Sequence, residues 1–323
     1  MEFSIYLMNH RKALGLFLLT IAPIIGSGQF ATPQDYSKMQ VSSSAYWMDL
    51  DYVGDGQLGH KLDIHLPPEK RDSYPVVVCI YGSAWFSNAS KGSVFSDGLG
   101  QALLENGFAV VSLNHRSSRE AAFPAQLHDV RAALRFIYSN AAQFSLDTSF
   151  VGLTGWSSGG HLTSLTATTQ GLDAYKLEGS SIDLDGGLGK YADSAYQVHA
   201  AVDWYGPTDF LVMDDCGSSF SHNAADSPES TLLGGPIQQH QTASRLADPA
   251  TYVTGSTPAF LIIHGDNDQT VPYCQSEHLY RRLKETGVES RFITVEGGGH
   301  GPGVMIQPYF DAMVGFFKEH LNR

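Results

Sequence analysis

Short apolar runs rich in β-branched residues alternate along the chain with longer segments whose apolar positions recur every three or four residues. The clearest of these segments is 124–139, where Leu127, Val130, Leu134 and Ile137 fall on one helical face. Two further helices are predicted, over 274–286 and 307–321. Strands are predicted at six apolar runs: 75–81, 108–113, 149–153, 199–204, 258–263 and 291–295.

Nearly continuous apolar strands that alternate with helices indicate an α/β fold, a mostly parallel sheet covered by helices on both faces. Residues 46–66 predict a leading antiparallel hairpin. The segments 171–195 and 213–245 are rich in Gly, Ser and Asp and lack periodicity. Because ligands bind beyond the carboxyl ends of the strands in such sheets, we expect both segments to border the substrate, with surface decoration as the alternative.

The N-terminus carries a pattern of its own. Arg11 and Lys12 precede the apolar run 13–25, and small residues follow it. This order is typical of a secretory signal peptide, here residues 1–28, and predicts secretion or export to the periplasm. The alternative is an uncleaved anchor. A polar segment (29–45) and one α/β domain (46–323) would follow, with no stable membrane span once the signal is removed.

Composition narrows the classes of partner and cofactor. The chain has 323 residues and a net charge of −13, which argues against a nucleic-acid partner. Cys79 lies in a predicted strand, whereas Cys216 and Cys274 lie in predicted loops, and whether these two pair is left open. Neither zinc-type Cys/His spacing nor a complete calcium loop is present, so no metal or cofactor is expected. The sequence carries no indication of the oligomeric state.

The stretch GWSSGGHL (155–162) fits Gly-x-Ser-x-Gly in one frame only, with Ser157 at its centre. A predicted strand precedes it and a helix follows, which is the context of a nucleophile elbow. The sharp turn places the central residue in a strained backbone conformation and requires small flanking residues. Ser157 is therefore the predicted nucleophile.

A serine hydroxyl needs a base, and the chain offers several histidines. His300 lies in EGGGHGPG (296–303), after the last predicted strand and before the terminal helix. This is the place of the base in a fold whose triad runs in the order Ser, acid, His. The alternatives are His161, which we expect to pack locally, and His264, which we expect to shape the following turn.

The acid is expected in the loop after the penultimate strand, HGDNDQTVP (264–272). Asp268 lies farther out along this loop and is the predicted partner that orients the imidazole. Asp266 is interpreted as a turn residue that hydrogen-bonds its own backbone. An oxyanion hole is predicted from the backbone N–H groups of Ser83, Ala84 and Ser158.

These motifs resemble the α/β-hydrolase superfamily, and within it the BD-FAE (bifunctional feruloyl and acetyl xylan esterase-like) and hormone-sensitive-lipase-like esterases. The resemblance covers about residue 46 to the end of the chain and implies hydrolysis of carboxylic esters, often acetyl or feruloyl groups on plant polysaccharides. By position it assigns the triad to Ser157, Asp268 and His300. The matching motifs are YGSAW (81–85), NHR (114–116), FPAQLHDVRAALRFI (123–137), GWSSGGHL (155–162), DWYGPTD (203–209), HGDNDQTVP (264–272) and GGGHG (297–301).

One position departs from these relatives, which usually carry His-Gly-Gly where this chain has Tyr81-Gly82-Ser83. Backbone donors survive a Gly-to-Ser change only where the φ angle suits a residue with a Cβ. The departure therefore places the geometry of the donors, and the size of the acyl pocket, in question.

The leading hypothesis is a secreted serine carboxylesterase that acts through an acyl-enzyme on a small-molecule or polysaccharide-linked ester. An amidase, formamidase or S9-type peptidase with the same triad is the second hypothesis, and a non-catalytic binding protein on this scaffold is the third. Trp85 is interpreted either as a pocket wall or as packing. The candidate substrate contacts are Trp85, Trp156, Trp204, Tyr205, Asp215 and Phe220.

Overall fold

The fold is taken from a computed structural model, which describes residues 41–96 and 98–321. The chain divides into two units, 1–32 and 33–323, and every described residue belongs to the second. The proposed signal peptide and most of the polar segment that follows it lie outside the described residues. Within the described part, no helix is both long and apolar enough to cross a membrane.

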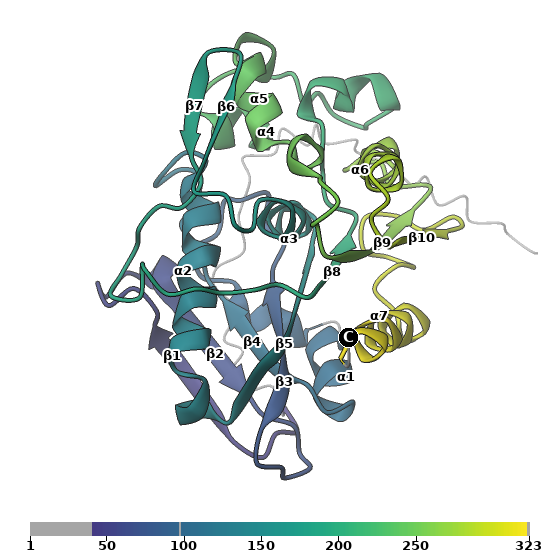
Figure 1. Cartoon of the computed structure of the whole chain (residues 1–323). Helices are drawn as coiled ribbons and strands as arrows, with labels where there is room; N and C mark the ends of the chain where they lie inside the picture. Colours follow the sequence, from purple (N-terminus) through teal and green to yellow (C-terminus); the bar gives the residue numbers. More distant parts are fainter. Residues whose placement is uncertain (1–40, 97, 322–323) are drawn as a thin grey trace, which may run out of the picture. The chain divides into compact units, whose positions relative to one another are not determined.

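An eight-stranded sheet forms the centre of the unit, with the strand order β1-β2-β4-β3-β5-β8-β9-β10 (Figure 1). β1 and β2 form the expected antiparallel hairpin, and the six strands from β4 to β10 in that order are parallel. The strands of this sheet are β1 (Tyr46–Asp51), β2 (Lys61–His65), β3 (Tyr74–Ile80), β4 (Ala109–Leu113), β5 (Leu146–Trp156), β8 (Ala200–Trp204), β9 (Ala259–Gly265) and β10 (Ser290–Val295).

Helices cover both faces, as the apolar strands require. Along β3, Val76 and Val78 pack into one core cluster, whereas Val77 and Cys79 pack into another on the opposite face. The first cluster includes residues of α2, α3 and α6, and the second includes residues of α1 and α7 (Figure 1). These helices are α1 (Leu99–Glu105), α2 (Ala125–Ser139), α3 (Ser158–Thr168), α6 (Cys274–Glu285) and α7 (Gln307–His320). The α/β-hydrolase fold is thus confirmed.

The two aperiodic segments contain short elements that the pattern does not predict. A separate two-stranded sheet, β6 (Ala174–Leu177) with β7 (Ser180–Asp183), lies in the first. Helices shorter than two turns show no usable periodicity. The short α-helices of the second segment, and the 3-10 turns throughout the chain, were therefore not predicted. They are α4 (Pro228–Leu233), α5 (Gln241–Ala247), η2 (Leu58–His60), η3 (Lys91–Phe95), η4 (Ala141–Phe144), η5 (Phe210–Cys216), η6 (Ile237–Gln239) and η7 (Pro249–Tyr252).

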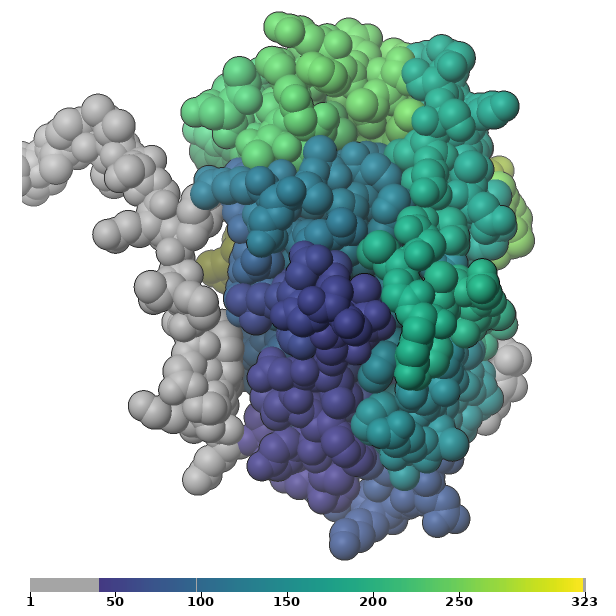
Figure 2. Space-filling view, turned by 90° about the vertical axis from the view of Figure 1, so that its left-hand side faces the viewer, coloured from purple at the N-terminus to yellow at the C-terminus, as the bar shows by residue number. Residues whose placement is uncertain are grey.

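Segment 171–195 lies against the start of α2 and the β1–β2 hairpin, and none of its residues lines either cavity at Ser157, so the border with the substrate expected of it is not found. Its residues Ile182 and Leu184 pack with Leu127 of α2 in a small core cluster. Farther along, a Cβ at Gly189 would lie 3.0 Å from the Cα of Val53, next to the β1–β2 hairpin. Figure 2 shows the purple hairpin at this face with the teal segment beside it. The segment therefore packs over α2 and beside the hairpin.

The three cysteines separate into two roles. Cys216 and Cys274 form a disulfide that ties the end of η5 to the start of α6. Cys79 is buried in β3, and this burial raises the pKa of its thiol well above the ordinary value. The pairing left open by the sequence is thus decided by tertiary proximity, and Cys79 is a small residue of the core.

Candidate active site

Ser157 sits in the turn between β5 and α3, with φ 56° and ψ −126°, a combination that residues with a Cβ rarely adopt. Its flanking glycines are required by close packing. A Cβ at Gly155 would lie 2.4 Å from the Gly159 carbonyl oxygen, and one at Gly159 would lie 2.2 Å from the Ile80 carbonyl oxygen. The predicted spacing therefore reflects a turn pressed against the neighbouring strand.

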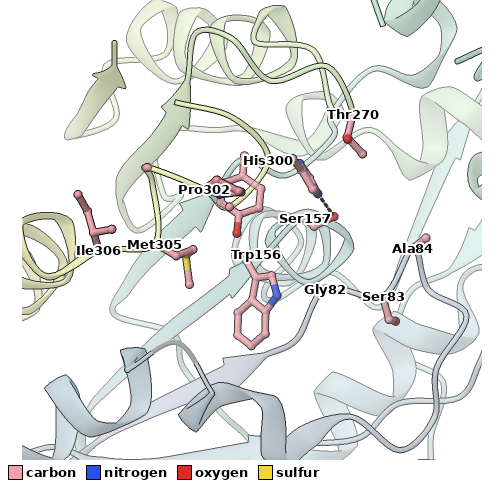
Figure 3. Close-up of a pocket in the computed structure, with 13 residues that line it drawn as sticks. Gly82, Ser83, Ala84, Trp156, Ser157, Thr270, His300, Pro302, Met305 and Ile306 are labelled. Atoms are coloured by element: carbon pink, nitrogen blue, oxygen red, sulfur yellow. Dashed lines mark hydrogen bonds between the residues drawn. The ribbon is translucent and has the colours of Figure 1, made fainter. Parts of the chain in front are cut away.

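The structure brings the three predicted side chains into one hydrogen-bonded line. His300 Nε2 lies 2.9 Å from Ser157 Oγ, and His300 Nδ1 lies 2.8 Å from Asp268 Oδ2 (Figure 3). A carboxylate only accepts hydrogen bonds, so Nδ1 carries the proton that it donates to Asp268. Nε2 of the neutral ring is then free to accept the hydroxyl proton of Ser157.

Asp268 is buried and held from several sides. Its Oδ1 accepts hydrogen bonds from the backbone N–H groups of Thr270 at 2.8 Å and Val271 at 3.0 Å. Burial by itself raises the pKa of this carboxyl, but the hydrogen bonds from His264 and His300 outweigh it and hold the pKa well below its ordinary value. Asp268 is therefore the ionised partner that a histidine base needs.

The two histidines set aside from the sequence have structural partners. His264 is fully buried, 2.7 Å from Ser276 Oγ and 2.9 Å from the Val271 carbonyl, so it shapes the loop that carries Asp268. His161 Nε2 donates to the Ala247 carbonyl at 2.8 Å, and burial lowers the pKa of His161 to about 4. Neither ring can serve Ser157 while these bonds hold.

Asp266 has a different partner from the one predicted. Its Oδ1 accepts a hydrogen bond of 2.7 Å from the backbone N–H of Gly297, in the loop that carries His300. The side chain thus links the acid loop to the base loop instead of closing a turn on its own backbone.

The oxyanion prediction needs a correction at Ser83. The Ser83 N–H donates to Ser158 Oγ at 2.9 Å, so this amide is occupied by the neighbouring hydroxyl. The Ser158 N–H belongs to the first turn of α3, where no earlier carbonyl of the helix can accept it. The amides of Ala84 and Ser158 remain the candidate donors.

The departure from Gly-Gly at this loop is accommodated without strain at Ser83. Left-handed φ angles occur instead at the next two residues, 52° at Ala84 and 57° at Trp85. Gly82 is the position that must stay small, because a Cβ there would lie 2.6 Å from the Trp156 carbonyl oxygen. The loop therefore keeps its path past Ser157 with a serine in the place of the second glycine.

A surface cavity of about 640 Å³ opens beside Ser157 and His300 (Figure 3). Trp156 and Tyr205, two of the candidate substrate contacts, line it, and the Tyr205 ring lies edge-on to His300 at a centroid distance of 4.7 Å. Sequence reasoning missed the wall formed by the segment after His300. That wall consists of Gly301, Pro302, Gly303, Met305 and Ile306.

A second, much smaller cavity of about 40 Å³ also touches Ser157. Trp85 and Phe220 line it, together with two residues that the sequence did not single out, His222 and Glu229. Trp85 is buried and packs edge-on against His161 and Phe210, so it is both a packed core residue and a cavity wall. The 213–245 segment therefore reaches the site through its residues 220–229.

Two candidate substrate contacts are wrong. Trp204 is fully buried, its Nε1–H donates to Thr154 Oγ1 at 3.0 Å, and its ring packs edge-on against Phe310. Asp215 is exposed on η5 and lines neither cavity. Trp204 is the last residue of β8 and packs in the core, whereas the next residue, Tyr205, leaves the strand with a φ of 43° and lines the large cavity.

One cluster in the described part of the chain has the composition of a metal site: Asp209, Asp248 and His278. Each carboxylate already accepts a backbone N–H at a helix start, Asp209 from Leu211 and Asp248 from Ala250. Asp248 also accepts from His278 Nε2 at 3.2 Å. The cluster is explained by these caps and the ion pair between them.

Comparison with known proteins agrees with this geometry. Residues 62–283 match the family model described as BD-FAE. A truncated carbohydrate esterase from gut microbiota is similar over 88% of this chain and 99% of its own, with 41% identity and a TM-score of 0.84. A bifunctional GH43-CE protein of Bacteroides eggerthii is similar over 85% of this chain and 38% of its own, with 46% identity and a TM-score of 0.80.

More distant relatives carry esterase names. The probable carboxylic ester hydrolase LipM of Mycobacterium tuberculosis is 27% identical over 80% of this chain, and the match spans 57% of LipM. The chain thus spans little more than half the length of this relative, and the same holds for the esterase LipC of that organism, at 53%. Because the family model matches well over half of the sequence, the chain belongs to the BD-FAE family of the α/β-hydrolase superfamily.

Proposed function

We propose that the protein is a secreted serine carboxylesterase that removes acyl groups, acetyl or feruloyl, from a carbohydrate or a similar alcohol through an acyl-enzyme. One observation carries the proposal: the continuous line of hydrogen bonds from Ser157 Oγ through His300 to Asp268, with distances of 2.9 and 2.8 Å. This arrangement is what activates a serine hydroxyl for attack on a carbonyl.

The reaction follows from the positions of the protons. Ser157 Oγ attacks the ester carbonyl while His300 Nε2 takes the hydroxyl proton, and the imidazolium is stabilised by the carboxylate of Asp268. His300 then gives this proton to the leaving alkoxide, and an acyl-Ser157 ester remains. Water, deprotonated by His300, cleaves that ester in the same way and regenerates the hydroxyl.

The negative charge of each tetrahedral intermediate lies on the former carbonyl oxygen. The N–H groups of Ala84 and Ser158 are the proposed donors to this oxygen, each contributing a few kcal/mol to lowering the barrier. The Ser83 N–H is not among these donors but has a structural role. Its hydrogen bond to Ser158 Oγ holds the oxyanion loop (residues 82–85) against the turn at Ser157.

The lining of the large cavity supports a neutral substrate. No Asp, Glu, Lys or Arg is among its lining residues in the described part of the chain. Its polar and aromatic lining residues are Ser83, Trp156, Ser157, Tyr205, Thr270 and His300. Neutral polar and aromatic groups of this kind suit the hydroxyls and ring faces of a sugar. The names of the carbohydrate esterase and of the GH43-CE neighbour support the same substrate class.

Export is the second part of the proposal, and it rests on the basic and apolar pattern of residues 11–28. A disulfide between Cys216 and Cys274 fits an oxidising compartment, where such bonds persist. N-terminal sequencing of the protein recovered outside the cytoplasm is expected to begin near residue 29; a full-length chain retained on membranes would contradict this part.

The test of the activity compares two adjacent serines. Ser157→Ala is expected to lower kcat on p-nitrophenyl acetate about 10⁶-fold, to the level without a nucleophile, and to abolish labelling by a fluorophosphonate probe. Ser158→Ala removes only the hydroxyl that holds the Ser83 amide, so labelling is expected to persist at a reduced rate.

Two outcomes would contradict the proposal. Full activity of Ser157→Ala would exclude this serine as the nucleophile. Faster hydrolysis of an acetanilide than of the matched acetate ester by the unmodified protein would assign the triad to amide bonds instead.

A further inference from the structure

The two cavities at Ser157 differ in more than size. Both are lined by Ala84, Ser157 and Thr270, so they meet at the reacting hydroxyl. His300 lines only the cavity of about 640 Å³, and Ser158 lines only the cavity of about 40 Å³. In Figure 3, Met305 and Ile306 of the large cavity lie on one side of Ser157, whereas Ala84 and Thr270 lie on the other. The acyl half and the alcohol half of an ester bound at Ser157 can therefore extend into different cavities.

The position of the base decides which half lies where. His300 must protonate the oxygen of the leaving alcohol, and a general acid acts only within hydrogen-bond reach of that atom. Because the His300 side chain faces the large cavity, the alcohol leaves through that cavity. The acyl half, attached to the opposite side of the carbonyl carbon, is directed toward the small one.

We infer that the small cavity is the acyl pocket and that it admits an acetyl group while excluding a feruloyl group. This inference rests on the proposed esterase function and narrows its acyl class to the two-carbon acid, with the sugar on the open side. At about 40 Å³ against about 640 Å³ for the other cavity, this pocket suits a two-carbon acetyl group and not a ten-carbon aromatic acid.

The walls of the pocket are held in place by contacts outside it. Trp85 is held edge-on between His161 and Phe210, at centroid distances of 5.2 and 5.7 Å. Phe220 lies against the His222 ring at 4.3 Å, and His222 Nδ1 lies 3.1 Å from Glu229 Oε1. The Trp85 wall is thus fixed in the core, whereas the Phe220 wall is held by its contact with His222.

The buried polar atoms of the pocket also disfavour a long apolar chain. Glu229 and Trp85 are nearly inaccessible, and neither Glu229 Oε2 nor Trp85 Nε1 has a hydrogen-bond partner among the described residues. An alkyl or aryl chain that filled this space could satisfy neither atom, so its burial would gain little.

The continuation of the chain supports the same division. Asp214 accepts the backbone N–H of His222 at 2.6 Å, and Ser219 N–H donates to the Gln269 carbonyl at 2.9 Å. The wall segment is thereby attached to the loop that carries Asp268. These hydrogen bonds therefore connect the residues that limit the size of the pocket to the loop that positions Asp268.

The experiment compares acyl groups on one alcohol. For the unmodified protein, kcat/KM on p-nitrophenyl acetate is expected to exceed that on the butyrate by at least about 100-fold, since each added methylene in a tight pocket costs about 10-fold or more. Hydrolysis of the ferulate is expected to be at least about 1000-fold slower than that of the acetate, on the same basis.

Two variants widen the pocket from different sides. Phe220→Ala removes a half-exposed ring, and Val271→Ala trims a buried wall residue. Each is expected to lower the acetate-to-butyrate ratio at least about 10-fold, because the added methylenes then fit. Ile306→Ala is the matched control: it trims a residue that lines the large cavity alone, so it is expected to change KM for an acetylated sugar but not the acyl ratio.

The outcomes separate the inference from the function on which it rests. If butyrate and ferulate are hydrolysed within a few-fold of acetate, or if Ile306→Ala alters the acyl ratio while Phe220→Ala and Val271→Ala do not, the acyl assignment is wrong and the esterase proposal stands. If no ester is hydrolysed and the fluorophosphonate probe fails to label Ser157, the esterase proposal itself is wrong.

Discussion

At Ser157 a single backbone angle separates the nucleophile from its neighbour. The φ of 56° turns this residue out of β5, whereas Ser158 continues into the regular first turn of α3. The Ser158 hydroxyl then accepts a hydrogen bond from the Ser83 N–H. Ser157 is therefore the nucleophile, whereas Ser158 holds the oxyanion loop against the elbow. The residue motif predicted the first role, but not the second.

The two carboxylates of the acid loop allow a matched test at the same scale. Asp268→Asn is expected to lower kcat about 10⁴-fold, because an amide at this position favours the wrong tautomer of His300. Asp266→Asn keeps an oxygen that can accept the Gly297 N–H, so its kcat is expected to fall less than about 10-fold. Steady-state kinetics on p-nitrophenyl acetate measures both, with melting temperatures as the check on folding. Equal losses in the two variants would contradict the assignment of the acid.

Among the elements, η5 and α6 matter most for the substrate, because the disulfide between Cys216 and Cys274 joins them beside the wall of the small cavity. Ser219 and His222, which fasten this wall, follow Cys216 within six residues. The disulfide therefore restrains the segment after Cys216, which contains no long helix in the part that lines the small cavity.

Removal of the disulfide therefore has two expected consequences. The bond closes a loop of 58 residues, and the chain-entropy model attributes about 4 kcal/mol of stability to such a loop. Cys216→Ser with Cys274→Ser is expected to lower the free energy of unfolding by about 2–4 kcal/mol in urea. It is also expected to reduce the preference for acetate over butyrate, because the Phe220 wall is loosened.

A reductant supplies the control for this prediction. Dithiothreitol is expected to bring the unmodified protein toward the behaviour of the double variant and to leave that variant unchanged. Equal stability of the oxidised protein and the double variant would contradict the structural role of the bond.

For the whole molecule, acidification is governed in part by histidines buried in neutral form. Burial lowers the pKa of His161 and of His65 to about 4, with the charge of Lys91 adding to the effect at His65. In the unfolded chain these rings titrate near 6.5. Their contribution to stability is therefore complete above about pH 6.5 and is lost as the pH falls toward 4, at about 1.4 kcal/mol per pH unit for each ring.

Two other histidines act in the opposite direction. Hydrogen bonds to carboxylates raise the pKa of His60, against the effect of burial, and the bond to Asp248 raises that of His278. Their contribution is complete at low pH and lost as the pH rises. The measured pH dependence of the unmodified protein is thus a sum, and a variant is needed to isolate one ring.

His161→Gln provides that variant, because the glutamine amide can still donate to the Ala247 carbonyl. The free energy of unfolding in urea is expected to fall between pH 7.5 and pH 5 by about 2 kcal/mol less in the variant than in the unmodified protein. Identical differences in the two proteins would show that His161 is not protonated on unfolding in this range.

The sequence by itself determined the strands of the central sheet, the helices α2, α3, α6 and α7, the elbow at Ser157 and the loops that carry Asp268 and His300. These features depend on periodicity along one segment or on a sharp turn that needs Gly155 and Gly159, and both are local. The short helices α1, α4 and α5 and the β6–β7 pair lacked such a signal, because elements of only four to seven residues show too few repeats of the apolar pattern.

Only the tertiary structure decided the pairing of Cys216 with Cys274, the occupation of the Ser83 amide and the burial of Trp204. It also packed segment 171–195 against α2 and away from the two cavities at Ser157, and brought Phe220 and Glu229 to the smaller one. Each of these outcomes depends on which residues meet across dozens of positions in the chain. Contacts of that range arise when the helices close over the sheet, and no pattern within one segment records them.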